Sequence, residues 1–141
     1  MKPRTARGLA LVLAALALWL VADRREDTGA PPPQVIEALF ERGASGVFVE
    51  ALGVVDRLLP DDNSGSRHQR FVVRLASGHT VLISHNIDLA PRVENLAAGD
   101  SVSFLGEYEW NERGGVIHWT HHDPDGRRAG GWVRAHGREY R

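Results

Sequence analysis

Hydrophobic and polar residues alternate along most of the chain after residue 46, and this period of two predicts β-strands. The first alternating segment, VFVEALGVVDRLL over residues 47–59, predicts a long strand that bulges or bends at Gly53. Two pairs of segments follow, HQRFVVRLA with TVLISHN and SVSFLGEYEW with VIHWTHH, and a glycine-containing turn joins each pair. The pattern therefore predicts one strand followed by two hairpins.

A helical period occurs just before the first strand. In QVIEALFERG, Val35, Ile36, Leu39 and Phe40 share one face, and Gly43 is a stop signal, which together predict one short amphipathic helix. The segment IDLAPRVENLAAGD between the two hairpins predicts an irregular connection with a helical turn. This order of elements is typical of a mainly β, five-stranded OB-fold-like small barrel, and an SH3-like barrel is the alternative.

The N-terminal 22 residues have the pattern of an export signal. Basic residues precede the uncharged run GLALVLAALALWLVA, residues 8–22, which the charged segment DRRED ends. As a helix this run would be about 22 Å long, shorter than the ~30 Å hydrocarbon layer, which favours a signal peptide. Leu20 is bulky for a cleavage site that ends at Ala22, so an uncleaved N-terminal membrane anchor stays open. Both alternatives predict an extracytoplasmic domain, either periplasmic or secreted, or anchored to the inner membrane.

The remaining chain is predicted to consist of a charged, proline-rich linker over residues 23–33 and a single domain over residues 34–141. The absence of cysteine excludes disulfides and thiolate zinc sites. Residues 31–125 contain seven arginines against fourteen acidic residues, whereas residues 126–141 contain five arginines against one. Such an acidic body disfavours a nucleic-acid partner unless the basic C-terminal tail supplies the contacts.

Two resemblances support this layout. An exported leader followed by GDSVSFLGEYEW and a closing strand is similar to the layout of secreted bacterial OB-fold stress proteins. The segments HQRFVVRL, HNIDLAPRV and GEYEWNERGGVIHWTHHDPDGR, with the later GGW, resemble the uncharacterised bacterial family catalogued as domain of unknown function 3465. That resemblance covers roughly residues 68–140, and it implies no activity, ligand or catalytic residue.

The segment HWTHHDPDG, residues 118–126, holds the densest group of candidate functional residues. If the strand continues through it, Trp119 and His121 face the core, whereas His118 and His122 face outward. The outward pair would then be about 13 Å apart along the strand, too far to hold one small ion. The segment DPDG predicts a β-turn.

A metal ion bound by these residues would therefore have to lie where this strand ends, with ligands from more than one strand. The metal candidates, for a divalent ion such as zinc, are His85, His121, His122 and Asp123. The catalytic candidates are His85, Asp88 and His121, and the ligand-binding candidates are Asn86, His118, Trp119, His122 and Arg70. A purely structural hydrogen-bonding role stays open for His85, His121 and His122.

Outward carboxylates provide one more possibility. Glu107 and Glu109 share the outer face of the fourth predicted strand, where they form a solvated surface or meet His118 or His122 across the hairpin.

Three function classes remain. The first is a binding domain for a small molecule or cation, including a divalent metal. The second is a metal-assisted hydrolase of phosphodiesters or other esters, and the third binds single-stranded nucleic acid through the arginine-rich tail.

Overall fold

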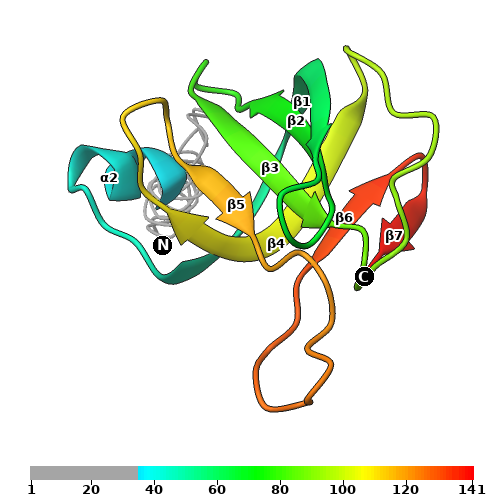
Figure 1. Cartoon of the computed structure of the whole chain (residues 1–141). Coiled ribbons are helices and arrows are strands. Elements are labelled where there is room, and N and C mark those ends of the chain that lie inside the picture. Colours follow the sequence, from blue (N-terminus) through cyan, green and yellow to red (C-terminus); the bar gives the residue numbers. More distant parts are fainter. Residues whose placement is uncertain (1–34) are drawn as a thin grey trace, which may run out of the picture. The chain divides into compact units, whose positions relative to one another are not determined.

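The computed structural model describes residues 35–141, which Figure 1 shows in colour. The predicted leader over residues 1–22 and the linker over residues 23–33 lie outside the described residues. Within residues 35–141, no helix has the length and apolar character needed to cross a membrane.

The described chain contains one helix and seven strands in a single mixed sheet. The helix α2 (Val35–Glu41) comes first, as the sequence pattern predicts, and it buries Ile36 and Leu39. The strands are β1 (Val47–Asp62), β2 (His68–Arg74), β3 (Thr80–Asn86), β4 (Ser101–Glu109), β5 (Val116–His118), β6 (Trp132–Ala135) and β7 (Arg138–Tyr140).

Five of the strands form a ring. The hydrogen-bonded order β1-β2-β3-β5-β4 closes on itself because β4 also pairs with β1. The β3–β5 pairing is parallel, and the other pairings are antiparallel. The strands β6 and β7 extend the sheet from β4, as the right-hand side of Figure 1 shows. The predicted mainly β chain with one short helix is therefore confirmed.

The first strand serves two neighbours, and Gly53 lies where it passes from one to the other. Its first half pairs with β4 from Val47 to Val54, and its second half pairs with β2 from Val54 onward. A side chain at Gly53 would lie 2.4 Å from a methyl group of Val73 and 2.6 Å from the carbonyl oxygen of Arg74, so β1 and β2 approach too closely there for a larger residue. The strand was predicted to bulge or bend at Gly53; the first register shift in its pairing with β2 lies slightly further along, between Val55 and Arg57.

The core fills the inside of the ring with alternate residues of its strands. Phe71, Ile83, Phe104, Tyr108 and Ile117 have no exposed surface. In each strand the residues before and after such a core residue point to the opposite face, and most of them are more exposed. This is the alternation with a period of two from which the strands were predicted.

Two predicted segments differ in the structure. The strand predicted to run through residues 116–122 ends at His118, because Trp119 has a φ of 58°, a left-handed backbone conformation that interrupts the alternation. Beyond this point the predicted faces hold only in part: His121 is buried and His122 is exposed, as predicted, but Thr120, which alternation places on the same face as His118, is completely buried. The connection over residues 87–100 consists of turns without a helix.

Candidate metal site on the outer face

The hairpin of β4 and β5 places two carboxylates and one imidazole side by side on the outer face. Tyr108 pairs with Ile117, and both side chains are buried. The residues on either side of them must then face outward, so Glu107 and Glu109 in β4 and His118 in β5 share that surface. Glu107 is the direct cross-strand partner of His118.

These three residues, named here the outer triad, can offer ligand atoms that all lie within 4.8 Å of one another. The His118 Nε2 atom lies 3.9 Å from Glu107 Oε1 and 3.7 Å from Glu109 Oε1. Both distances are too long for a direct hydrogen bond. Two ligand atoms that share a tetrahedral zinc ion are about 3.4 Å apart, so the triad needs only a small adjustment to bind one.

The Nε2 atom of His118 is a buried polar atom without a hydrogen-bond partner among residues 35–141. The side chain as a whole is 39 % exposed, so the burial concerns this one atom. An orphaned nitrogen costs free energy that a third atom between it and the carboxylates would recover. This makes His118 available as a ligand.

Arg128 makes a second contact with the outer triad. Its guanidinium forms an ion pair with Glu107 Oε2 and lies 4.4 Å from the centre of the Trp119 ring. The ion pair uses the Glu107 oxygen that is not directed toward His118. Two carboxylates and one guanidinium leave a net negative charge beside the His118 imidazole, which suits a divalent cation.

The predicted strand-exit residues, named here the exit cluster, are His85, His121, His122 and Asp123. All four are described, and they form no group whose ligand atoms converge as those of the outer triad do. The loop that carries the last three extends away from the sheet between β5 and β6, in orange in Figure 1. Among residues 35–141, no three of these four residues therefore place ligand atoms close enough together to hold one metal ion.

His85 is completely buried and uses both ring nitrogens within the protein. The Nε2 atom lies 2.9 Å from the carbonyl oxygen of Pro91, and Nδ1 lies 2.8 Å from Thr120 Oγ1. A carbonyl only accepts, so Nε2 carries the proton and Nδ1 accepts from the threonine hydroxyl. Burial is the main cause that lowers the pKa of His85 below its usual value, which keeps the ring neutral.

His121 and Asp123 are also engaged by the loop. The ring of His121 is buried against Trp119, with centroids 4.8 Å apart, and its Nδ1 donates to the carbonyl oxygen of His122 at 2.7 Å. Burial lowers the pKa of His121 as well. The Asp123 carboxylate accepts from the backbone N–H groups of Asp125, Arg127 and Arg128, at 3.1, 2.7 and 2.7 Å.

Those three donors lower the pKa of Asp123, although desolvation, the largest single effect, acts to raise it. Asp123 also starts the predicted β-turn, since the N–H of Gly126 donates to its carbonyl oxygen at 3.0 Å. The observed contacts of Asp123 are thus those of a turn residue.

The other candidates lie apart from the outer triad, except His118 itself. Asp88 accepts from the backbone N–H and the Nε atom of Arg67, at 2.8 and 2.7 Å. The Asn86 Oδ1 atom accepts from the N–H of Asp88 at 2.9 Å, and His122 is exposed. Arg70 lines a groove on the outer face of β2. The sequence pattern placed Glu107, Glu109 and His118 on the outer face, but the metal ligands were predicted at the end of the strand. The apolar residues Tyr108 and Ile117 between these positions are the signal that sets their register.

The comparisons with known proteins give one family and no individual relative. A family model described as "Protein of unknown function (DUF3465)" matches residues 26–141. No curated protein and no solved structure matches the chain.

Proposed function

The chain belongs to the DUF3465 family, and from that premise we propose that it is an exported, OB-fold-like domain that binds a divalent metal ion at Glu107, Glu109 and His118. One observation carries the proposal: three ligand atoms from adjacent strands lie within 4.8 Å, and one of them is a buried imidazole nitrogen without a partner among the described residues. The family description names no activity, so the geometry of these three residues is the basis of the proposal.

Zinc is the ion we expect. It binds imidazole nitrogen at ~2.0–2.1 Å and carboxylate oxygen at ~2.0–2.2 Å, and it accepts three protein ligands with water in the fourth position. The outer triad offers one nitrogen and two carboxylate groups, and Glu109 and His118 are each 39 % exposed, so a water molecule has access. Calcium and magnesium prefer oxygen ligands alone, so the imidazole favours a transition metal.

The arrangement of strands supports an OB-fold-like barrel. A ring in the order β1-β2-β3-β5-β4, with a parallel β3–β5 pairing, has the five strands of that small Greek-key barrel. The ring favours this architecture over the SH3-like alternative. The barrel positions the triad, because the antiparallel β4–β5 pairing sets Glu107 opposite His118.

The extracytoplasmic location rests on the pattern of the first 22 residues. The basic residues, the uncharged run and the polar boundary support export, and the bulky residues before Ala22 support retention as an anchor. Fractionation of cells that express the full chain, with mass determination of the product, tests both parts. A full-length product in the cytoplasm would refute export, and a full-length product in the membrane would support the anchor.

The metal proposal is tested by titrating metal-free full-length protein with zinc in a calorimeter. We expect one zinc ion per chain and a loss of affinity of about tenfold or more in His118→Ala and Glu109→Gln, since each removes one ligand. The matched control is His122→Ala, an exposed histidine of the exit cluster, which should bind zinc as the unchanged protein does.

Two results would refute the proposal. One is the absence of zinc binding. The other is a loss of affinity in His122→Ala without a loss in His118→Ala, which would return the metal to the exit cluster. Unfolding curves of the variants establish that each is folded.

A metal-assisted hydrolase is the second candidate. The three-ligand site leaves a coordination position at which a metal ion can hold and activate water, and the half-exposed surface admits a substrate. Zinc-dependent cleavage of ester or phosphodiester substrates, abolished by His118→Ala, would support it. Zinc binding without turnover would favour the binding domain.

Single-stranded nucleic-acid binding is the third candidate, and the tail gives it little support. Four of its five arginines, Arg128, Arg134, Arg138 and Arg141, already form ion pairs with carboxylates. We expect no salt-dependent binding of an oligonucleotide.

A further inference from the structure

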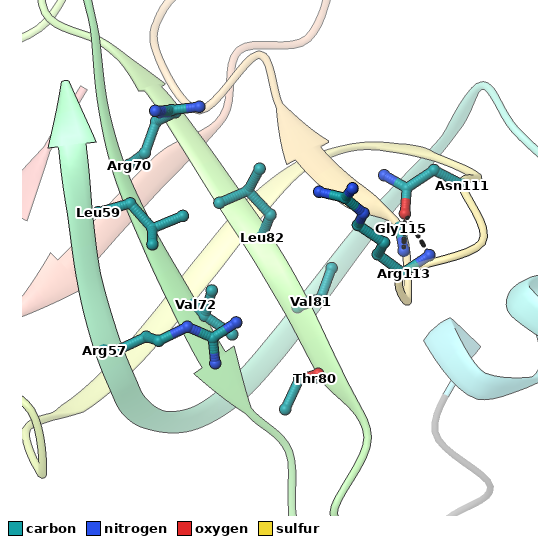
Figure 2. A pocket seen from close by; sticks show the side chains of 10 residues that line it. All are labelled: Arg57, Leu59, Arg70, Val72, Thr80, Val81, Leu82, Asn111, Arg113 and Gly115. Atoms are coloured by element: carbon teal, nitrogen blue, oxygen red, sulfur yellow. Dashed lines mark hydrogen bonds between the residues drawn. The ribbon is translucent and has the colours of Figure 1, made fainter. Parts of the chain in front are cut away.

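A groove lies on the outer face of β1, β2 and β3, where the β4–β5 loop overhangs it (Figure 2). It shares no residue with the outer triad, and its volume is about 250 Å³. The residues that line it include three arginines and three aliphatic residues: Arg57, Arg70, Arg113, Leu59, Val72 and Leu82.

The charge of the groove is opposite to that of the surrounding domain. Three of the seven arginines of residues 31–125 line it, and none of its ten lining residues is acidic. Arg57 pairs with Asp56 at 2.6 Å, beside the groove. Such a local concentration of guanidinium groups in an acidic body is a site for an anion.

Two of these arginines keep donors free of partners within residues 35–141. The Nε atom of Arg70 donates to the carbonyl oxygen of Pro60 at 2.9 Å, which fixes the side chain, and its terminal nitrogens have no partner among these residues. The nearby Asp61 is held by Arg92 at 2.7 and 3.0 Å. The guanidinium of Arg113 forms neither an ion pair nor a hydrogen bond with any side chain described in residues 35–141, and Figure 2 shows it directed toward Leu82.

The floor between the arginines is apolar. Leu59, Val72 and Leu82 come from three adjacent strands and face outward, as Figure 2 shows. A row of aliphatic side chains on the outer face departs from the polar surface expected there. It gives a ligand with an apolar part a surface to cover.

The loop that carries Arg113 is held in place before any ligand arrives. The Oδ1 atom of Asn111 accepts from the N–H groups of Arg113 and Gly115, at 2.9 and 3.1 Å, as the dashed lines of Figure 2 mark. The N–H of Leu82 donates to the carbonyl oxygen of Gly115 at 3.1 Å, which ties the loop to β3. A fixed loop loses little conformational entropy on binding, so its arginine is preorganised.

We propose that this groove binds a small organic phosphate: a phosphate group held by Arg70 and Arg113, attached to an apolar or aromatic group that covers the aliphatic floor. Phosphate matches the guanidinium fork and can accept from two arginines at once. The small volume selects a single ring with one phosphate over a polymer. No residue of the outer triad takes part, so binding does not require the metal.

The probe is phenyl phosphate, titrated calorimetrically into the full-length, metal-free protein. We expect saturable binding that weakens about tenfold or more in Arg113→Ala and in Arg70→Ala, because each removes charge-assisted hydrogen bonds. Arg42→Ala is the matched control: Arg42 is exposed, follows α2 and does not line the groove, so the affinity should stay unchanged.

Further ligands separate the contributions. Inorganic phosphate should bind more weakly than phenyl phosphate, since it leaves the floor uncovered, and phenol should not bind measurably. Binding should persist in His118→Ala, which separates this proposal from the metal site.

Three results would overturn it. They are no binding of phenyl phosphate at millimolar concentration, equal affinity in the arginine variants and the control, and tighter binding of oligothymidylate that depends on the same arginines. The last would assign the groove to a nucleic-acid strand. Thermal unfolding of each variant verifies that it is folded, and substitution at these surface arginines should leave the fold intact.

Discussion

The outer triad and the exit cluster contain the same kinds of side chain, and they differ in what their donors and acceptors already contact. In the exit cluster, His85 uses both ring nitrogens within the protein, and the Asp123 carboxylate accepts three backbone N–H groups. In the outer triad, the Nε2 atom of His118 faces two carboxylates at 3.7 and 3.9 Å without a hydrogen bond.

The availability of lone pairs, more than the density of histidine, therefore distinguishes a candidate ligand set. A metal ion competes for each lone pair with the hydrogen bond that already uses it. At His85 that competition would also disrupt buried contacts with Pro91 and Thr120, whereas at His118 no such contact is lost.

Removing the buried imidazole should cost far more stability than removing the outer one. We expect His85→Ala to lower the free energy of unfolding by about 2–4 kcal/mol, because it creates a cavity and leaves the Pro91 carbonyl without its donor. The matched change His118→Ala should cost less than about 0.5 kcal/mol. Urea unfolding measures both, and comparable losses would contradict the contrast.

A methyl group beneath the outer triad should disturb it from the inside. A Cβ atom at Gly106 would lie 2.5 Å from the His118 carbonyl oxygen and 2.7 Å from a methyl of Ile117, so β5 must move. We expect Gly106→Ala to lower the free energy of unfolding by about 1–3 kcal/mol and to weaken zinc binding.

The control for this change is Gly65→Ala. That glycine has open space around it and a φ of 79°, so an alanine there adds backbone strain without displacing β5. Its stability should fall by about 1 kcal/mol with zinc affinity unchanged. Zinc binding that survives Gly106→Ala unaltered would separate the metal site from the β4–β5 pairing.

The buried histidines should make stability depend on pH in a defined direction. Burial lowers the pKa of His85 below 6.5. Between the two pKa values the unfolded chain therefore binds a proton at this ring, whereas the folded chain does not. The stabilisation is complete above pH 6.5 and is lost as the pH falls from 6.5 toward the lower, folded-state pKa. His121 acts in the same direction.

We therefore expect the free energy of unfolding to decrease between pH 7.5 and 5.5, by up to about 1.4 kcal/mol per pH unit for each extra proton bound by the unfolded chain. His85→Gln removes one of these protons and should flatten the curve, whereas His118→Gln is the comparison at the outer face. A curve that His85→Gln leaves unaltered would show that the buried ring does not control the dependence.

Arg128 should weaken metal binding modestly. Its guanidinium forms an ion pair with Glu107, one of the proposed ligands, and so lies close to the proposed position of the ion. We expect Arg128→Ala to raise zinc affinity by about three- to tenfold, since it removes a nearby like charge from the ion. Arg127→Ala is the neighbouring control in the same exposed loop. Weaker zinc binding in Arg128→Ala would instead make Arg128 a residue that positions Glu107.

Much of the sheet follows from alternation in the sequence, because a strand with one buried face must repeat every two residues. The same rule placed Glu107, Glu109 and His118 on the outer face, and the structure confirms that His118 meets the carboxylates. The basic tail adds two further strands to the sheet, and its aromatic residues Trp132 and Tyr140 are buried in β6 and β7.

The exit cluster was less predictable, because its structure depends on contacts between distant segments. The left-handed conformation of Trp119 ends β5, and alternation carries no signal for one such residue. The ring of Trp119 contacts both the Arg128 guanidinium and the His121 ring, and the contact with Arg128 forms only after the loop returns. The role of His85 similarly depends on Pro91 and Thr120, which its own strand does not specify.

The shared first strand has a consequence for how the domain folds. β1 and β2 are neighbours in the sequence, whereas the N-terminal half of β1 pairs with β4, which two other strands separate from it along the chain. Contacts between residues so distant along the chain form slowly, because the intervening segment must be confined first. Until β4 arrives, residues 47–54 expose an unpaired edge with apolar side chains, and an emerging chain held at this stage would be the form most prone to aggregate.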